Sequence, residues 1–421
     1  MTKIPVRDLR LVVDYLRAVR NEVAVDRHIV AMAGLDPDAF GKIPRPARWI
    51  GKMRRFPLLS RLLQHISLPL WYVLGPALYA RHLRQIKGSL SSTKSPHFDV
   101  AGQILGLSQR AADIVHERHV PDMPRQWLEL PWMPLSGLPS EAEVIPAIAL
   151  MDEEDIARSL VLATLAHRAL QSRRDLRGWG LQSYTAWRWF YARLAIDKLP
   201  GPLLTTEHFD RLAVMADASV WASRLRRPGR FLTVMQHGSV NAGTSLCALG
   251  IKLPTMLRAV THLHVYTPED ADVFTREILS ATCRRRGVQI TFFRPFITLT
   301  DVVDARTPSV LFVGHPLCAD MHMMLATALM TARAGIRVLY KPHPTTGGGK
   351  AADHFAWTLV QGRTTFPRVD AVVSYPSTMV GEYAAHDIPT IVHSMALPTD
   401  QAAQLLPEIL WHIDARCDNP G

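Results

Sequence analysis

The stretch Val338-Leu339-Tyr340-Lys341-Pro342-His343-Pro344-Thr345-Thr346 is a short apolar run that stops at two prolines. Proline donates no backbone N–H and fixes its own φ, so it ends a strand instead of continuing it. The run therefore predicts a buried strand whose end presents Lys341 and His343. A cation and an imidazole at a strand end suit an anionic ligand.

Short apolar runs alternate with helical segments on both sides of this stretch, from about Pro200 to the C-terminus. This alternation is typical of α/β proteins. Ligands of open parallel sheets bind outside the carboxyl ends of the strands, so we expect the polar residues there to converge. The predicted strands are 231–235, 263–266, 288–293, 309–313, 338–340, 371–373 and 390–392, and the predicted helices are 268–285, 321–334 and 379–386.

The part of the chain before Pro200 is expected to be mainly helical. A Gly and Ser-rich segment at 88–96 is typical of a linker, and a Pro and Trp-rich connection spans 121–139. The predicted helices are 9–33, 104–119, 152–173 and 182–197.

The basic charge of the chain is local. The formal net charge is +11, and residues 39–98 hold eleven Lys or Arg and no Asp or Glu. The uncharged run 66–80 within this stretch is shorter than the roughly 20 residues of a bilayer span and contains two prolines. We expect it to lie at an anionic membrane surface through Lys52, Arg54, Arg55 and Trp71. The alternatives are a buried helical hairpin and, less favoured, a nucleic-acid contact.

The cysteines indicate neither a disulfide framework nor a metal centre. All four are scattered without a Cys-x-x-Cys spacing, which favours a reducing cytosol and no bound metal. The N-terminal residues alternate charged and apolar types as an amphipathic helix does, so no secretory signal is expected.

The predicted strand 371–373 leads into a group of hydroxyl side chains. Ser374, Ser377 and Thr378 precede a predicted helix, where hydroxyls and backbone N–H groups can bind an anion. Glu382 lies one turn further on, where a carboxylate can accept hydrogen bonds from a ribose diol. Ordinary helix capping is the alternative explanation for all four residues.

Two further strand ends carry histidines. His237 precedes Gly238 after the strand 231–235, and a neutral imidazole there can take a proton from a hydroxyl group. Asp210, in a Glu-His-Phe-Asp-Arg stretch upstream, is an alternative carboxylate base. Gly314 and His315 follow the strand 309–313, where glycine permits close backbone approach to a phosphate and His315 can bind it or cap a helix.

The Lys-Pro-His-Pro strand end, followed by Ser-x-x-Ser-Thr-x-x-x-Glu-Tyr-Ala and Ile-Pro-Thr-Ile, resembles the donor-domain signature of bacterial surface-polysaccharide transferases of the GT-B fold. It is similar to the motifs of sialyl- and polysialyltransferases, of the capsule polysaccharide biosynthesis family and of the CDP-glycerol glycerophosphotransferases. The resemblance covers about residues 200–400. The Asp/Glu-Asp-Gly motif of the bacterial sialyltransferases is absent.

This resemblance implies an α/β GT-B-like fold in which two Rossmann-like domains face a cleft, preceded by a mainly helical N-terminal extension. The expected parts are 1–95 for the extension with its membrane-contact stretch (39–98), 96–300 for the acceptor side and 301–421 for the donor side. His343, Ser377 and Thr378 would contact the nucleotide and its phosphate, with Lys341, Ser374 and His315 nearby.

The resemblance also implies a metal-independent glycosyltransferase at the inner face of the cytoplasmic membrane. Its donor would be a nucleotide-sugar co-substrate, CMP-linked in preference to UDP-linked, with no other cofactor and no nucleic acid. Its acceptor would be a surface or capsular polysaccharide or a lipid-linked glycan. The alternatives are a polyol-phosphate transferase, a non-catalytic membrane-associated scaffold and a nucleotide-sugar epimerase, for which no obvious second carboxylate pair is present.

Overall fold

The structure is a computed structural model, and it divides into two compact units that are described separately. The first comprises 1–30, 36–237 and 249–294, and the second comprises 31–35, 238–248 and 295–421. The structure describes residues 5–32, 57–90, 97–99, 101–107, 112–115, 124, 126–133, 138, 142–173, 176, 183–238, 253–293, 297–301, 307–343, 354–362, 364–395 and 397–418.

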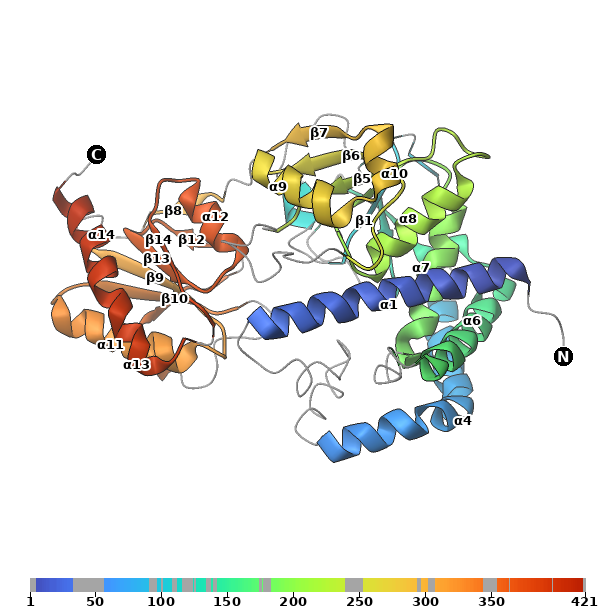
Figure 1. The fold of residues 1–421 in the computed structure, drawn as a ribbon, viewed down its shortest axis with the longest axis horizontal. Coiled ribbons are helices and arrows are strands. Elements are labelled where there is room, and N and C mark those ends of the chain that lie inside the picture. The colour runs from blue at the N-terminus through green and yellow to red at the C-terminus, as the bar shows by residue number, and fades with distance from the viewer. Residues whose placement is uncertain are drawn as a thin grey trace. The chain divides into compact units, whose positions relative to one another are not determined.

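The first unit is built on a seven-stranded sheet in which every neighbouring pair is parallel (Figure 1). The strand order is β3-β2-β1-β4-β5-β6-β7, so the chain reverses its direction of travel across the sheet between β1 and β4. This order is that of a doubly wound Rossmann sheet. The strands are β1 (Gln103–Leu105), β2 (Gln126–Glu129), β3 (Glu143–Pro146), β4 (Leu203–Thr205), β5 (Leu232–Met235), β6 (Val260–Val265) and β7 (Gln289–Phe292).

Helices of the first unit pack around this sheet and around each other. Tyr15 of α1 is fully buried and contacts Phe190 of α7, with ring centroids 5.1 Å apart. Buried ion pairs also hold α1, since Arg193 of α7 contacts Asp14 and Arg211 of α8 contacts Glu22. The helical segments are α1 (Val6–Met32), α4 (Pro57–Leu90), η1 (Ala147–Leu150), α6 (Glu153–Ser172), α7 (Ser183–Lys198), α8 (Arg211–Ser223), α9 (Pro268–Val273), the π-helix η3 (Phe274–Ile278) and α10 (Ala281–Arg286).

Three strands of this sheet lie before Pro200, where the sequence predicts helices and connections. The expected helix 104–119 is wrong at its start, because Ile104 and Leu105 lie in β1. These strands have only three or four residues, too few for a two-residue period to be visible. Two of them also contain buried glutamines, which are joined by a hydrogen bond from Gln103 Nε2 to Gln126 Oε1 at 3.1 Å.

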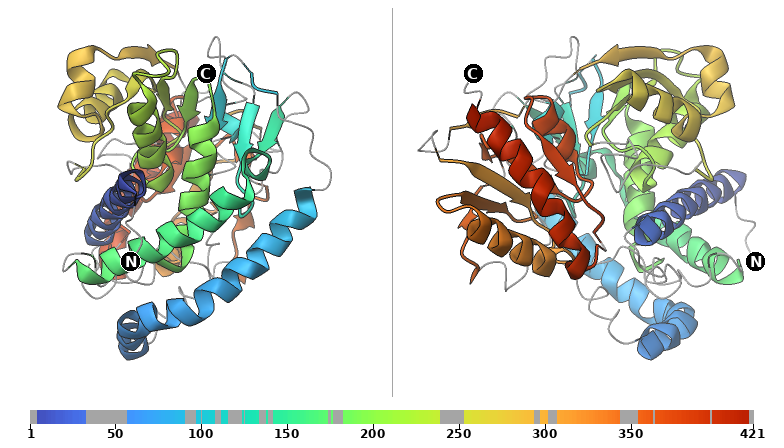
Figure 2. Two further views of the ribbon diagram at one scale, coloured as in Figure 1. Left: turned by 90° about the vertical axis from the view of Figure 1, so that its right-hand side faces the viewer. Right: turned by 60° about the vertical axis from the view of Figure 1, so that its left-hand side comes forward.

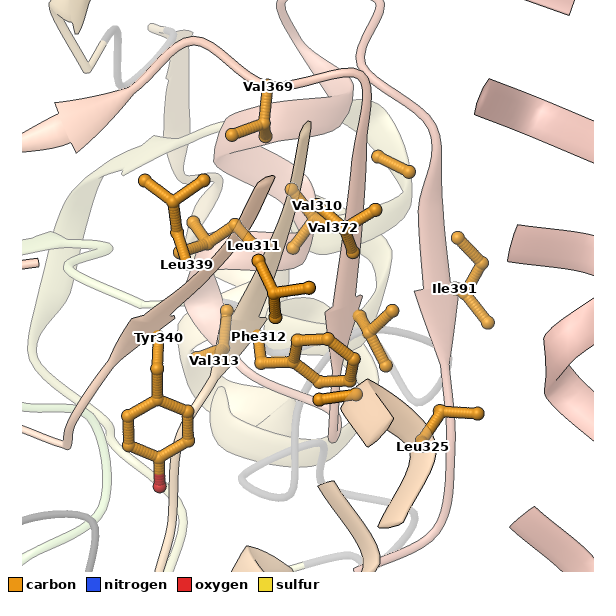
Figure 3. Packing of buried hydrophobic residues seen from close by; sticks show 14 of the residues in the cluster. Val310, Leu311, Phe312, Val313, Leu325, Leu339, Tyr340, Val369, Val372 and Ile391 are labelled. Carbon is orange, nitrogen blue, oxygen red and sulfur yellow. The ribbon is translucent and has the colours of Figure 1, made fainter. Parts of the chain in front are cut away.

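The second unit contains a five-stranded parallel sheet with the order β11-β10-β9-β13-β14. Its strands β9, β10 and β13 are almost entirely buried, and their valines, Leu311, Phe312 and Tyr340 form the core with residues of the flanking helices (Figure 3). The elements are β9 (Ser309–Val313), α11 (Ala319–Ala332), β10 (Arg337–Lys341), β11 (Thr358–Leu359), β13 (Ala371–Ser374), α12 (Thr378–Ala384), β14 (Thr390–Val392), α13 (Thr399–Ala402), η5 (Ala403–Leu405) and α14 (Leu406–Asp418), with the small parallel pair β8 (Leu299–Thr300) and β12 (Phe366–Pro367).

The prediction of two Rossmann-like α/β units with helices in the N-terminal part is confirmed. The predicted strands after Pro200 match β5, β6, β7, β9, β10, β13 and β14 to within a few residues. The predicted helix 268–285 is interrupted, because η3 and Leu279 separate α9 from α10.

The expected membrane-contact run lies within α4, one helix that contains Pro69 and Pro76. This observation excludes the helical hairpin. Trp71 is buried, since its Nε1 donates to Thr164 Oγ1 of α6 at 3.1 Å, so the expectation that this indole contacts a membrane is wrong. Figures 1 and 2 show α4 beside α6. Lys52, Arg54 and Arg55 lie outside the described residues.

Within the described ranges, the structure contains no helix that is both long and apolar enough to cross a bilayer.

Candidate functional site

Both parallel sheets have a point where the strand order reverses. In the first unit this point lies between the neighbours β1 and β4, and in the second unit it lies between β9 and β13. Connections leave such strands in opposite directions, which opens a crevice at their carboxyl ends where ligands bind. The residues that follow these strands are therefore the first candidates for a site.

In the first unit, the residues after β4 and β5 form a cluster of acids and histidines. Glu207 and His208 follow β4, Asp210 is the N-cap of α8, and His237 follows β5. We call these four residues the acid–histidine cluster. Leu107, just after β1, donates its backbone N–H to Glu207 Oε1 at 3.0 Å, which ties the cluster to the point of strand reversal.

Glu207 and Asp210 form a hydrogen-bonded pair of carboxyl groups. Burial raises the pKa of Asp210 well above its ordinary value, and the neighbouring Glu207 raises it further. Two carboxyl oxygens can share a hydrogen bond only if one group keeps its proton. Asp210 Oδ1 also accepts the Ala213 N–H at 3.0 Å and so caps α8. Asp210, expected as a catalytic carboxylate, is therefore a helix cap that tends to hold a proton.

His237 is oriented by the backbone of the neighbouring strand. Its Nδ1 is hydrogen-bonded to the carbonyl oxygen of Thr206, and because a carbonyl oxygen can only accept, Nδ1 carries the proton. This tautomer makes Nε2 the basic nitrogen. The half-buried ring lies 5.0 Å from that of His208, centroid to centroid.

His208 is buried beneath His237 and is held neutral. Its Nε2 lies 3.3 Å from the Met235 carbonyl oxygen, and its ring meets Phe274 edge to face at 4.9 Å. Burial lowers the pKa of His208 to about 3, and His237 contributes to the shift. His208 is thus a packing neighbour of His237 and does not compete for a proton near neutral pH.

In the second unit, a cluster of aromatic and hydroxyl side chains occupies the corresponding point. His315 follows β9, His343 follows β10, and Tyr375 follows β13. The His315 ring lies 5.6 Å from both the His343 ring and the Tyr375 ring, with edge-to-face geometry in each case. With Ser377 these residues form what we call the histidine–tyrosine cluster. The predicted convergence of His315 and His343 is confirmed.

The imidazoles of this cluster are neutral near pH 7. Burial, with a contribution from His343, lowers the pKa of His315 to about 4, and burial lowers the pKa of His343. His315 Nδ1 accepts the backbone N–H of Leu317 at 3.2 Å, so its Nε2 carries the proton and can donate. The cluster thus offers neutral hydrogen-bond donors to an anion.

The hydroxyl group after β13 is ordered by internal hydrogen bonds. Ser374 is fully buried, and its Oγ lies 2.6 Å from the Tyr375 carbonyl oxygen and 3.0 Å from Ser377 Oγ. Ser377 is the N-cap of α12 and Thr378 is the first residue of that helix, as the sequence predicts. Glu382 is buried at 3% exposure within α12, and its contact with a ribose stays a prediction.

Lys341 stabilises a neighbouring part of the chain, and its expected contact with a phosphate stays a prediction. Its Nζ donates to the carbonyl oxygens of Gly362 and Thr365, both at 2.8 Å, and lies 5.0 Å from the Phe366 ring centroid. Lys341 is the last residue of β10 and is 8% exposed. The sequence shows a lysine next to the strand end but not the direction of its side chain.

Gly314 is required by packing. A Cβ at Gly314 would collide with the ring of Tyr340, which is fully buried and stacks on Trp357 at 4.1 Å with an interplanar angle of 5°. This packing explains the glycine without the expected close approach of a phosphate.

The structure contains a buried histidine pair near the histidine–tyrosine cluster that no pattern in the sequence predicts. His322 Nε2 lies 2.8 Å from His393 Nε2, and His393 Nδ1 lies 3.0 Å from the Ser394 carbonyl oxygen. The carbonyl fixes the proton on His393 Nδ1, so His393 Nε2 accepts from His322 Nε2–H. His322 Nδ1 then accepts from Cys318 Sγ at 3.9 Å. His322 belongs to no sequence motif. The only sign of its contact with Cys318 in the sequence is that the two residues lie four positions apart at the start of α11.

Within the described ranges, no group of three or more His, Cys, Asp or Glu side chains is placed to hold a metal ion.

Comparisons with known proteins give fold-level similarities only. No family model matches the chain, and no curated protein matches it. Among solved structures, it is similar to a protein assigned as a UDP-N-acetylglucosamine 2-epimerase from Listeria monocytogenes, with 10% identity, a TM-score of 0.40, and coverage of 75% of this chain and 87% of the other.

Two further similar structures are a synthase and a transferase by name. The sucrose-phosphate synthase of Thermosynechococcus elongatus shares 13% identity at a TM-score of 0.32, covering 74% of this chain and 86% of the other. A mutant O-GlcNAc transferase of Thermobaculum terrenum shares 11% identity at a TM-score of 0.24, covering 59% and 56%. TM-scores this low carry no argument about activity, so the function has to be inferred from the residues.

Proposed function

We propose that the chain is a glycosyltransferase that moves a sugar from a nucleotide-activated donor to a hydroxyl group of a glycan acceptor. One observation carries this proposal: each unit has a cluster of polar, reactive side chains at the reversal point of its own parallel sheet. The acid–histidine cluster contains an oriented imidazole, and the histidine–tyrosine cluster contains neutral hydrogen-bond donors. The first suits proton transfer from an acceptor, and the second suits a phosphate.

His237 is the proposed base. Its Nε2 takes the proton of the acceptor hydroxyl while that oxygen attacks the anomeric carbon of the donor sugar. The bond between the anomeric carbon and the nucleotide phosphate oxygen breaks, and its electron pair stays with the phosphate. The hydrogen bond from Nδ1 to Thr206 stabilises the imidazolium that forms.

His315, His343, Tyr375 and Ser377 are the proposed ligands of the donor phosphate. Neutral N–H and O–H donors that are already in position stabilise the charge that develops on a leaving phosphate. The motif resemblance favours a CMP-sugar over a UDP-sugar as donor and a surface or capsular polysaccharide or glycolipid as acceptor.

Contact with the inner face of the cytoplasmic membrane is part of the proposal. α4 exposes a row of large apolar side chains along its length, among them Leu58 at 78%, Leu62 at 56% and Val73 at 73%. An exposed apolar helix face preceded by a basic segment suits binding in the interface of an anionic bilayer.

Vesicle binding tests the membrane contact. The Leu58→Gln/Leu62→Gln variant should lose co-sedimentation with phosphatidylglycerol vesicles, whereas Val161→Gln on α6, which is 55% exposed, should retain it. Equal binding of both variants and the parent protein would remove the membrane from the proposal.

A nucleotide screen tests the proposed activity. Thermal unfolding with CMP, CDP, UDP and GDP should show one nucleotide that raises the Tm, because a ligand bound only by the native state stabilises it. The matching nucleotide-sugar should then release that nucleotide in the presence of a glycan acceptor. If no nucleotide raises the Tm and no nucleotide-sugar is consumed, the proposal fails.

The hydrogen-bonded pair Glu207–Asp210 favours one second candidate, a nucleotide-sugar epimerase. The sequence showed no obvious carboxylate pair, but the fold brings these two side chains together. An epimerase converts its nucleotide-sugar without an acceptor, so proton NMR of a donor incubated alone separates the two activities. A polyol-phosphate transferase would instead form a phosphodiester visible by phosphorus NMR, and a scaffold would consume no donor.

A further inference from the structure

The first unit contains a cavity of about 900 Å³ that includes none of the residues of its acid–histidine cluster. It is lined by the first turns of α1, the C-terminal end of α7 and the C-terminal end of α8 with the turn that follows. Asp210 and Arg224 cap opposite ends of α8, which has 13 residues and is therefore about 20 Å long. The cavity thus lies near the amino ends of the strands, on the opposite edge from the acid–histidine cluster.

The lining of this cavity is strongly cationic. Nine arginines and two aspartates, Asp14 and Asp197, line it. Both aspartates contact Arg193, which is 3% exposed, and Asp14 also contacts Arg17. Arg258 pairs with Asp217. The other six arginines make no carboxylate pair among the residues that the structure describes.

Helix capping explains only some of these arginines. Arg227 donates to the carbonyl oxygens of Asp197 and Leu199 at the end of α7, and Arg224 donates to the Trp221 carbonyl oxygen. Such contacts stabilise helix C-termini. Arg10 on α1 and Arg226 after α8 make no side-chain hydrogen bond or ion pair within the described ranges, so their place at the cavity has no structural explanation.

Arg230 is, with Arg193, one of the two most deeply buried of these cations. It is 3% exposed, and its guanidinium donates to Ser223 Oγ at 2.9 Å, Ser219 Oγ at 3.0 Å and the Ile196 carbonyl oxygen at 2.6 Å. All of these partners are neutral, and its buried Nε has no partner. Burial together with Arg227 and Arg193 lowers the pKa of Arg230 to about 10, against the effect of Asp197. Asp197 acts on Arg230 only at a distance, through Ser219 Oγ, so the buried guanidinium has no direct ion pair and a bound anion would lower the cost of its burial.

Trp221 gives the cavity an aromatic wall that gathers more cations. The guanidinium groups of Arg224 and Arg258 lie 3.9 Å and 5.3 Å from its ring centroid, and that of Arg286 lies at 5.0 Å. Contacts with an aromatic face hold such groups together despite their repulsion. The result is an ordered set of guanidinium forks, the geometry that best matches phosphate oxygens.

We propose that this cavity is a second binding site, for an anion that carries two or more phosphate groups. Its volume lies in the range of small-molecule sites, and its excess of arginines needs several negative charges for balance. The anion is either a soluble phosphate compound or the headgroup of a phospholipid. This inference does not rest on the proposed glycosyl transfer, because none of the residues assigned to that reaction lines the cavity.

Calorimetric titration with inorganic triphosphate tests the site. The parent protein should bind one triphosphate saturably in this cavity, and Arg10→Gln/Arg226→Gln should raise the Kd at least tenfold. Both side chains are exposed, so their replacement leaves the buried Arg230 contacts intact. The control Arg276→Gln/Arg368→Gln removes the same charge from exposed arginines elsewhere and should change the Kd less than twofold.

Two further experiments identify the source of the phosphate and distinguish binding in this cavity from binding at the proposed donor site. His343→Ala should leave triphosphate binding in the cavity unchanged. If vesicles that contain cardiolipin, whose headgroup carries two phosphates, compete with triphosphate and the Arg10→Gln/Arg226→Gln variant binds them weakly, the ligand is a headgroup; if they do not compete, it is soluble. The proposal is overturned if triphosphate does not bind saturably, or if it binds the Arg10→Gln/Arg226→Gln variant as tightly as the parent.

Discussion

The acid–histidine cluster and the histidine–tyrosine cluster occupy equivalent places in two similar sheets but differ in chemistry. The first holds a hydrogen-bonded carboxyl pair beside an imidazole whose tautomer a backbone carbonyl fixes. The second combines neutral imidazoles with a phenol and a serine. A cluster with acidic groups repels a phosphate, whereas a neutral cluster of donors accepts one. On this difference we base the expectation that proton transfer and phosphate binding are divided between the two units.

The largest expected effect is on His237, the proposed base. His237→Gln should lower kcat by about 10²- to 10⁴-fold, the usual contribution of general base catalysis, and leave the KM for the donor within about twofold. Steady-state kinetics with the nucleotide-sugar found by the screen measures both.

The exposed His354 provides the matched control for this test. His354→Gln should keep the parent rate, and circular dichroism should show that both variants fold. If His237→Gln retains the parent rate, the acid–histidine cluster has no role in proton transfer. The proposed division of tasks between the two clusters would then be wrong.

The next effect concerns the buried pair His322–His393, which lies beside the end of β13, where the His393 N–H donates to the Ser374 carbonyl oxygen at 3.0 Å. His393→Phe removes the acceptor of His322 Nε2–H and should lower the free energy of unfolding by about 1–3 kcal/mol. Urea unfolding measures the change.

His393→Gln is the informative companion, because its amide oxygen can accept the same hydrogen bond. It should recover part of the lost stability. If His393→Phe and His393→Gln lower the free energy of unfolding equally, the hydrogen bond between His322 and His393 does not stabilise the second unit.

The positions of the clusters could be predicted better than their side-chain directions. The strand ends after 231–235, 309–313 and 371–373 were visible as apolar runs followed by Gly, Pro or Ser, and they place His237, His315 and Ser374 correctly. Strand polarity alone brings such residues to one edge. Lys341 shows the limit, because the sequence does not reveal that its Nζ donates to the carbonyl oxygens of Gly362 and Thr365.

Other features depend on contacts between segments that are distant in the sequence. The strands β1 to β3 are recognisable as strands only once they pair with each other. Trp71 was assigned to a membrane surface because its neighbours are apolar, but its hydrogen bond to Thr164 requires a helix 93 residues away. The sequence around a residue does not show which distant residues it contacts.

The third expected effect tests phosphate binding by the second cluster. His343→Ala should raise the nucleotide Kd about tenfold, which corresponds to about 1.4 kcal/mol, with kcat at saturating donor changed much less. Calorimetric titration and steady-state kinetics measure the two quantities. His354→Ala again serves as the control.

A fall in kcat at unchanged nucleotide Kd in His343→Ala would contradict this expectation. It would mean that the second cluster acts on the reaction step and that the division between the units is wrong.

The smallest expected effect is a pH dependence of nucleotide binding. In the free protein the pKa of His315 is lowered to about 4, and that of His343 is lowered as well. A bound phosphate stabilises the imidazolium form and raises both pKa values, so the complex takes up protons. By linkage the affinity should rise as the pH falls, about two- to fivefold between pH 7.5 and 6.0. The nucleotide phosphate also titrates near pH 6, so the measurement compares the parent with His315→Asn/His343→Asn, in which only the nucleotide's own contribution remains. Equal pH dependence in both proteins would mean that these imidazoles do not face the phosphate, and a weaker pH dependence in the variant would support a phosphate site in the second cluster.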